Sequence, residues 1–407
     1  MSERTCEIAI VGAGPAGAHL ASRLAYRGRD CVLFDPKGAW EKPCGGGVPS
    51  RALREFSFLL ESFSYPRKLI RRITMISPLE RRVTVDFPMP FAIYSRSVLN
   101  GLVLDRAIEA GARFQRTAVS DFSKERDGWS IRTEDGAIWR SRFLVGADGA
   151  ASFTRRRLVG IFPVCDLALA FGYNIAHDDE GGSPIGSSVR KRSGAKPFEE
   201  VVIRFPRNFT GYLWAFPRPG VMNFGVASKL GEKTSTELRE LLKGFVSDYY
   251  GGKMPDGEHV SFFGAKIPTL DLKSWRRLQA CGEGWALIGD SAGFADPITG
   301  EGIYYAFKSA DLLADSFEAG GGEQYAMVVS EYDRAWRESF GRELEHASYR
   351  LPQFYHGTFF GHLFTDAVVR LARYHRGVRT ILVRALMGEQ SYVTLKRDLL
   401  RRAYQIV

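Results

Sequence analysis

Residues 6–36 contain a strand, a glycine-rich turn, a helix and a second strand in succession, and this segment constrains the fold more than any other. The apolar run CEIAIV, which ends at Val11, predicts the first buried strand, and the turn Gly12-Ala13-Gly14-Pro15-Ala16-Gly17 follows at once. Residues 18–26 are rich in Ala and Leu and predict the helix, while DCVLF at 30–34 predicts the second strand. Together these parts form a βαβ unit, so we expect a parallel sheet with helices packed on it.

The glycines of the turn form the pattern GxGxxG, which is typical of loops that bind dinucleotides. Gly12 allows a sharp turn, Gly14 allows a pyrophosphate to approach the backbone, and Gly17 allows the helix to pack closely on the strand. Free N–H groups and a partial positive charge at the start of the helix would bind that pyrophosphate. Asp35 follows the second strand, where we expect an acid to hold a ribose hydroxyl.

Two later motifs indicate which dinucleotide binds. FLVGADGAAS at 143–152 and ALIGDSAG at 286–293 resemble the second and third fingerprints of the FAD-binding enzymes that share the p-hydroxybenzoate hydroxylase fold. In that family the Asp of the GD motif binds the FAD ribityl chain, which would be Asp290 here, and the DG motif at Asp148 lies beside the cofactor. Arg96 also matches a family arginine near the FAD. The resemblance implies FAD as the cofactor.

The turn DPITGEG at 296–302 follows the third motif and opens a further helix. A flavin ring can lie close to such a small-residue backbone. The N-terminus of that helix would place positive potential near the flavin edge where charge builds up on reduction. A plain glycine-rich helix cap is the alternative.

Two further motifs narrow the resemblance. CGGG at 44–47 lies in the loop region after the second strand, and GYLWAFP at 211–217 precedes NFGVA at 223–227. Together they resemble the geranylgeranyl reductase family, over essentially the whole chain. Members of that family carry CGGG near the isoalloxazine ring and a Tyr-x-Trp-x-Phe-Pro segment, followed by a small Gly-x-Gly strand, along a lipid tunnel. The second Gly of that strand is Ala227 here.

The resemblance implies that Cys44, Tyr212 and Trp214 lie at the flavin or substrate pocket. Cys44 as a small buried residue, and the alternating aromatic residues as ordinary sheet core, remain alternatives. The residues expected to contact FAD are Gly12, Gly14, Pro15, Ala16, Gly17, Asp35, Cys44, Gly45, Gly46, Gly47, Arg96, Asp148, Gly149, Gly289, Asp290, Pro297, Gly300 and Gly302.

Three functions remain open from the sequence. The first is a reductase that transfers hydride from reduced FAD to carbon–carbon double bonds of a prenyl lipid. The second is oxygen activation by a flavin monooxygenase or halogenase acting on an aromatic substrate. Halogenases need a lysine between flavin and substrate, and Lys42 and Lys68 are the lysines nearest to such a position in this sequence. The third is a non-enzymatic prenyl-lipid carrier. The electron donor, NAD(P)H or ferredoxin, and the oligomeric state are not determined by the sequence.

The fold class we expect is α/β (α+β): a Rossmann-like FAD-binding domain, an inserted antiparallel β-sheet substrate domain and a C-terminal helical region. The segment from about residue 166 to 268 is rich in strand-like patterns and is interrupted by a helix at 235–249. This segment predicts the inserted sheet. Shorter elements are predicted as strands at 69–77, 81–87, 129–134, 137–140 and 142–146 and a helix at 100–110. The expected boundaries are 1–75, 95–165 and 275–325 for the FAD-binding domain, 76–94 and 166–274 for the substrate domain, and 326–407 for the helical region.

The net charge and the cysteine content limit the classes of partner that this protein can have. The chain carries 56 Lys and Arg against 46 Asp and Glu, a net charge of +10, and much of the excess lies in the tail from Arg350 to Val407. A basic tail suits an anionic membrane surface or an acidic ligand, or is simply a solvated helix face; no nucleic-acid-binding motif is present. The five cysteines form no CxxC pair, so we expect no metal site and no disulfide framework. We expect a cytoplasmic protein, or one at a membrane surface, without a signal peptide.

Overall fold

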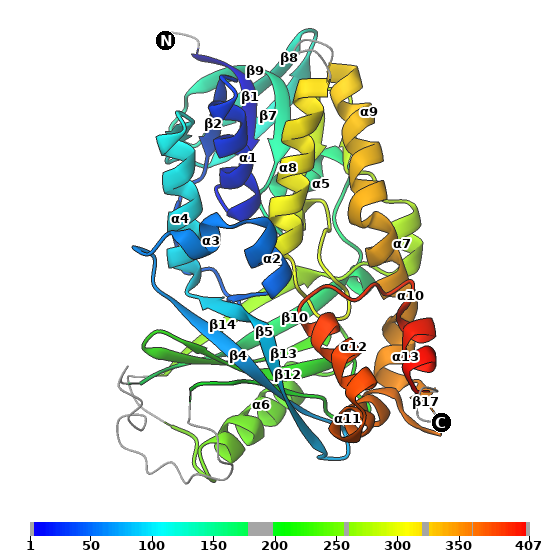
Figure 1. The fold of residues 1–407 in the computed structure, drawn as a ribbon. Coiled ribbons are helices and arrows are strands. Elements are labelled where there is room, and N and C mark those ends of the chain that lie inside the picture. Colours follow the sequence, from blue (N-terminus) through cyan, green and yellow to red (C-terminus); the bar gives the residue numbers. More distant parts are fainter. Residues whose placement is uncertain (1–3, 178–197, 256–259, 320–324, 360, 404–407) are drawn as a thin grey trace. The chain divides into compact units, whose positions relative to one another are not determined.

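The computed structural model describes residues 4–177, 198–255, 260–319, 325–359 and 361–403. Contacts divide the chain into two compact units (Figure 1). The first comprises residues 1–42, 96–163 and 268–345, and the second comprises residues 43–95, 164–267 and 346–407. In the part of the chain that is described, no helix is both long and apolar enough to cross a bilayer.

The first unit contains a sheet whose strands run in the order β15-β16-β9-β1-β2-β6, with the β7–β8 hairpin attached to β9. From β16 to β6 neighbouring strands are parallel, as the βαβ pattern predicts. The strands are β1 (Arg4–Val11), β2 (Cys31–Phe34), β6 (Arg113–Gln115), β7 (Val119–Glu125), β8 (Gly128–Thr133), β9 (Ile138–Gly146), β15 (Cys281–Gly282) and β16 (Trp285–Leu287).

The central strand β1 is fully buried at Ile8, Ala9 and Ile10, because helices of this unit cover the sheet. Helix α1 contacts both α4 and α8 and lies between them (Figure 1). The helical elements of this unit are α1 (Pro15–Tyr26), α4 (Arg96–Glu109), α5 (Phe153–Leu158), α7 (Leu272–Arg276), η2 (Gly289–Ser291), α8 (Ile303–Ala319), α9 (Tyr325–Trp336) and the π-helical turn η3 (Arg337–Gly341).

The second unit contains a sheet in the order β14-β10-β13-β12-β11-β4-β5-β3. From β10 to β3 neighbouring strands are antiparallel, except that β4 pairs with β11 in parallel. Its strands are β3 (Gly47–Val48), β4 (Arg67–Ile76), β5 (Arg82–Tyr94), β10 (Leu167–Ala176), β11 (Val201–Arg204), β12 (Gly211–Arg218), β13 (Val221–Lys229) and β14 (Val260–Pro268).

Helix α6 (Ser235–Tyr249) covers one face of this sheet with its apolar side chains Leu238, Leu242, Phe245 and Val246. A capping box between Thr234 and Glu237 fixes where it begins. The other helical elements are α2 (Ser50–Glu55), α3 (Phe58–Glu61), η1 (Val164–Asp166), α10 (Arg342–His356), of which residues 346–356 belong to this unit, α11 (Phe364–Tyr374), α12 (Arg376–Leu386) and α13 (Leu395–Ala403). A short hairpin, β17 (Thr358–Phe359) with β18 (His362–Leu363), precedes α11.

The expected fold class is confirmed, and the helix at 235–249 has the predicted bounds. The two compact units do not coincide with the three expected parts: residues 268–274 belong to the first unit, and residues 346–407, expected as a separate helical region, belong to the second. Residues 43–75 belong to the second unit, because β4 pairs with β5 and β11. Helix α9, which was expected in the C-terminal region, belongs to the first unit, where it packs on α8.

Candidate functional site

The GxGxxG loop joins β1 to α1, and two of its glycines lie too close to neighbouring backbone atoms for a Cβ. Gly12 has φ +104°, and a Cβ there would lie 2.5 Å from the carbonyl oxygen of Ala147. A Cβ on Gly17 would lie 1.9 Å from the carbonyl oxygen of Gly12. No described atom lies within 4 Å of a Cβ built on Gly14. The first and third glycines are therefore required by packing, whereas the second leaves open space where a ligand can approach the backbone.

Asp35 connects the end of β2 to this loop. Its Oδ2 accepts a hydrogen bond from the backbone N–H of Ala13 (2.9 Å), and its Oδ1 accepts from the N–H groups of Lys37 and Gly38 (both 2.8 Å). The carboxylate therefore holds the glycine-rich loop against the second strand. Its expected contact with a ribose hydroxyl remains a prediction.

Asp148 organises the turn after β9. It accepts hydrogen bonds from the Ser152 hydroxyl and from the backbone N–H (2.9 Å) and hydroxyl (3.1 Å) of Thr154. Burial raises the pKa of the Asp148 carboxyl, and these hydrogen bonds oppose that effect only in part. Ser152 also caps α5 through the N–H of Arg155 (2.8 Å). The DG motif is thus a rigid turn.

Asp290, the acid of the GD motif, forms an ion pair with Lys42, whose Nζ lies 3.1 Å from its Oδ2. A Cβ on Gly302 would lie 3.0 Å from the Asp290 Oδ1, and one on Gly149 would lie 3.6 Å from the Lys42 Nζ. Lys42 therefore lies beside Gly149 of the second motif and Asp290 of the third. The sequence singled it out only as a halogenase lysine, and no local pattern indicates this contact.

Arg96 begins α4 and is almost fully buried, with 4% of its surface exposed. The backbone N–H groups of Arg96 and Ser97 donate to the Glu41 carboxylate (3.2 and 2.9 Å). One guanidinium N–H reaches Asn100 Oδ1 at 3.3 Å, but Nε is buried without a hydrogen-bond partner among the described residues. A buried guanidinium N–H is costly to leave unsatisfied, so this group suits an acceptor supplied by a ligand.

The turn at 296–302 is held by its own side chains. Asp296 accepts from the N–H groups of Ile298 (2.8 Å) and Thr299 (3.1 Å). Glu301 accepts from the N–H of Tyr304 (2.7 Å) in the first turn of α8. The Glu301 carboxylate offsets part of the positive potential that we expected at the start of this helix. Of the remaining predicted positions, Pro297 is buried, and Gly289 (φ +59°) and Gly300 (φ +68°) have left-handed backbone conformations.

The residues of the first unit fit FAD. The open space at Gly14 suits a pyrophosphate, and the unpaired Nε of Arg96 offers a donor. Asp290 offers acceptors for hydroxyl groups. All three fingerprint motifs lie in this one unit, as the sequence predicts.

The second unit contains an aromatic face on β12. Tyr212, Trp214 and Phe216 share it, with ring centroids 5.8 Å and 6.1 Å apart along the strand. Trp214 is 4% exposed, whereas Tyr212 and Phe216 are half-buried. A Cβ on Gly225 of β13 would lie 2.0 Å from the Trp214 ring, so only glycine leaves room for the indole there.

One buried asparagine, Asn223, and one half-buried asparagine, Asn174, fix the indole. The Trp214 Nε1–H donates to Asn223 Oδ1 (2.7 Å), and Asn223 Nδ2 donates in turn to Asn174 Oδ1 (2.7 Å). Asn223 is fully buried, so the chain satisfies polar groups that would otherwise destabilise the sheet. Neither asparagine was among the predicted site residues.

The CGGG loop lies on this aromatic face. A Cβ on Gly45 would lie 3.0 Å from the Phe216 ring and 3.3 Å from Trp214 Nε1, and one on Gly47 would lie 2.7 Å from the Phe91 ring. Gly46 has φ +77°, and a Cβ there would lie 2.0 Å from the carbonyl oxygen of Tyr94. The loop is therefore too close to its neighbours for larger residues.

Arg218 and Cys44 brace the same loop. The guanidinium of Arg218, which is 3% exposed, donates to the carbonyl oxygen of Cys44. The Cys44 Sγ accepts from the N–H of Gly46 at 3.3 Å. The structure thus places Gly45 of this loop beside Trp214, and Tyr212 beside the same indole, all within the second unit. The predicted contacts of residues 44–47 with FAD would involve both units and remain predictions.

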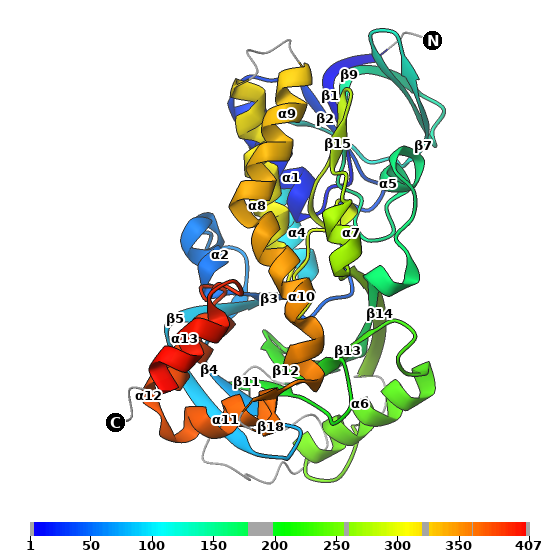
Figure 2. The same cartoon turned by 90° about the vertical axis from the view of Figure 1, so that its right-hand side faces the viewer.

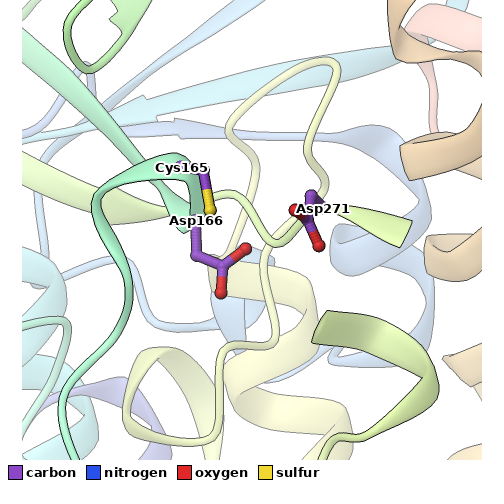
Figure 3. A group of neighbouring side chains, drawn as sticks. All are labelled: Cys165, Asp166 and Asp271. Carbon is purple, nitrogen blue, oxygen red and sulfur yellow. The ribbon is translucent and has the colours of Figure 1, made fainter. Parts of the chain in front are cut away.

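Figure 3 shows three side chains outside the predicted site, Cys165, Asp166 and Asp271. Asp271 of the first unit caps α7 by accepting from the N–H of Ser274 (2.7 Å). Cys165 and Asp166 of the second unit lie in η1, which leads into β10, and Asp166 is 1% exposed. We propose no metal ion at these side chains.

Comparisons with known proteins agree with these motifs. A family model described as FAD binding domain matches residues 5–164. The geranylgeranyl diphosphate reductase of Synechocystis is 26% identical over 82% of this chain and 81% of its own length. The menaquinone reductase of Mycobacterium tuberculosis is 27% identical over 77% of each chain.

Solved structures show the same fold. A geranylgeranyl bacteriochlorophyll reductase-like protein from Thermoplasma acidophilum matches with a TM-score of 0.77 and 19% identity, over 98% of this chain and 100% of its own. The flavin-dependent brominase Bmp2 matches with a TM-score of 0.70 and 16% identity, over 98% and 100%. The motifs, their geometry and these similarities lead to one conclusion: the chain is a FAD-dependent oxidoreductase, similar in sequence to proteins named geranylgeranyl diphosphate reductase and menaquinone reductase.

Proposed function

We propose that the protein reduces carbon–carbon double bonds in the isoprenoid chain of a prenyl lipid. The observation that carries the proposal is the packing of the CGGG loop on the aromatic face of β12 within the second unit. That face presents aromatic rings and backbone with few polar groups, which suits an apolar chain. The similarity to relatives named geranylgeranyl diphosphate reductase and menaquinone reductase supports the same substrate class.

When bound and reduced, FAD supplies a hydride to one alkene carbon, and a proton completes the other. An unactivated alkene offers little for an acid or base to hold, so the contribution of the chain is positioning. Tyr212 and Phe216 bind the apolar chain. Trp214 cannot turn away, because Gly225 lies against its ring and Asn223 holds its N–H. The electron donor, NADPH, NADH or a ferredoxin, is to be found by testing each with the oxidised flavoprotein.

An anaerobic reoxidation experiment tests the function. The flavoprotein is reduced with dithionite, excess reductant is removed, and geranylgeranyl diphosphate or menaquinone is added while the flavin absorbance is followed. We expect the flavin to reoxidise and mass spectrometry to show a lipid that has gained two hydrogens per flavin. A flavin that stays reduced with both lipids until oxygen is admitted would contradict the proposal.

A pair of variants tests the site. Trp214→Leu removes a ring of the aromatic face, and we expect a KM for the lipid at least tenfold higher with unchanged flavin content. Phe245→Leu is the matched control, since this ring packs in α6 on the other face of the same sheet. It should lower stability without raising KM.

Oxygen activation is the second candidate, because the brominase shares the fold. The ion pair of Lys42 with Asp290 favours a role for this lysine at the cofactor. A halogenase that uses Lys42 would lose all halogenation in Lys42→Ala. The interpretation as a non-enzymatic carrier is set aside, since the chain is an oxidoreductase.

A further inference from the structure

The C-terminal helices of the second unit form a cationic groove, which we define by the residues that line it. It is lined by Arg350 on α10, by Val393, and by four residues of α13: Lys396, Arg397, Leu400 and Arg401. The cavity measures about 660 Å³. Helix α13 packs on α12, and α12 on α11 (Figure 2). Four cations thus surround two aliphatic side chains.

Little negative charge offsets these cations. Asp398 is the acid of α13, and its carboxylate accepts from the Thr394 hydroxyl (2.6 Å) and from Gln390 Nε2 (3.0 Å), with Arg397 Nε at 3.7 Å. These hydrogen bonds hold the pKa of Asp398 below its usual value, so it stays ionised and offsets one charge. Lys396 and Arg401 form no ion pair with any residue in the described ranges.

The remaining cation, Arg350, meets a neutral partner and an exposed ring. It donates to the side-chain oxygen of Gln353 at 2.9 Å. Its guanidinium lies 5.4 Å from the ring centre of Tyr349, which is 60% exposed. The groove therefore keeps a net positive charge beside an aromatic ring that has a polar tip.

The apolar residues distinguish between anionic partners. Val393 is 44% exposed and Leu400 is half-buried, both among the cations. A nucleic-acid backbone would gain nothing from these aliphatic groups. At a bilayer surface they can enter the boundary between headgroups and acyl chains while Lys and Arg reach phosphates.

We propose that the cationic groove binds anionic phospholipid headgroups and so holds the protein at a membrane surface. The inference goes beyond the proposed reaction and does not depend on which lipid is reduced. Binding to an anionic surface would explain the excess positive charge of the tail, because each cation near such a surface raises the membrane partition coefficient about fivefold.

Vesicle flotation of the full-length, FAD-loaded protein tests the groove. Vesicles of phosphatidylcholine alone are compared with vesicles containing a third phosphatidylglycerol, at low and at high salt. We expect binding to the anionic vesicles only, with loss at high salt because screening weakens the attraction. The triple variant Lys396→Gln, Arg397→Gln, Arg401→Gln should lower the partition coefficient by about 100-fold.

The matched control removes the same charge elsewhere. Arg126→Gln, Arg132→Gln, Lys273→Gln changes three exposed cations of the first unit and should bind anionic vesicles as the wild type does. Equal losses in the two triple variants, or equal binding to neutral vesicles, would overturn the proposal. So would binding of inorganic pyrophosphate in the groove without any vesicle binding. Reduction of detergent-dispersed lipid should be unchanged in the groove variant, which separates this test from that of the reaction.

Discussion

The substitution Gly225→Ala tests whether the fit between β13 and the Trp214 indole sets the aromatic face. The new methyl group would lie 2.0, 2.4 and 2.5 Å from three carbons of the ring, distances that Cβ atoms do not adopt. The indole is buried and must move, which breaks its hydrogen bond to Asn223. Overpacking costs about 1–3 kcal/mol, and a buried polar group left unsatisfied costs about 1–3 kcal/mol more.

We therefore expect Gly225→Ala to lower the free energy of unfolding by about 3 kcal/mol. Urea denaturation of the FAD-loaded protein measures this change, and the KM for the lipid should rise as well. Gly244→Ala is the control: this glycine lies on the exposed side of α6 with no described atom within 4 Å of a Cβ. Alanine in a helix should stabilise by about 0.5–1 kcal/mol. Wild-type stability and KM in Gly225→Ala would refute the packing argument.

Three predictions concern the first unit. Asp290→Ala should weaken FAD binding at least tenfold in a flavin-fluorescence titration, whereas Asp315→Ala on exposed α8 surface should not; equal affinities would count against the GD assignment. Gly17→Ala should yield little folded flavoprotein on purification, because its Cβ would meet the Gly12 carbonyl oxygen at 1.9 Å. Burial raises the pKa of Asp311. The hydrogen bond and charge of His19 and the charge of Arg23 lower this pKa by a larger amount, so that it lies below its usual value of 3.8. The stability that this carboxylate adds should be complete above about pH 4 and lost as pH falls through its folded pKa, so wild type and Asp311→Asn should converge in acid-unfolding curves.

Local patterns determined much of this protein from the sequence alone. The order of apolar and small residues predicts the strand, glycine turn and helix of residues 6–26, and the structure has all three, with β1 beginning at Arg4 and α1 at Pro15. The helix at 235–249 was likewise predicted, and the structure has it with a capping box of Thr234 and Glu237 at its start. In contrast, β7 was not predicted, because its sequence VSDFSKE is mostly polar and exposed and carries no clear alternation.

The contacts that build the candidate sites were decided only by the tertiary structure. Lys42 meets Asp290 across 248 positions of the chain, and Gly45 lies on the ring of Phe216 only because the loop and β12 belong to one unit. Asn223 is unremarkable in the sequence until the pairing of β12 with β13 brings it to Trp214. Periodicity reports which face of one element is buried, but it carries no information on which distant element covers that face. The motifs therefore named the chemistry, and strand order and packing decided which side chains carry it.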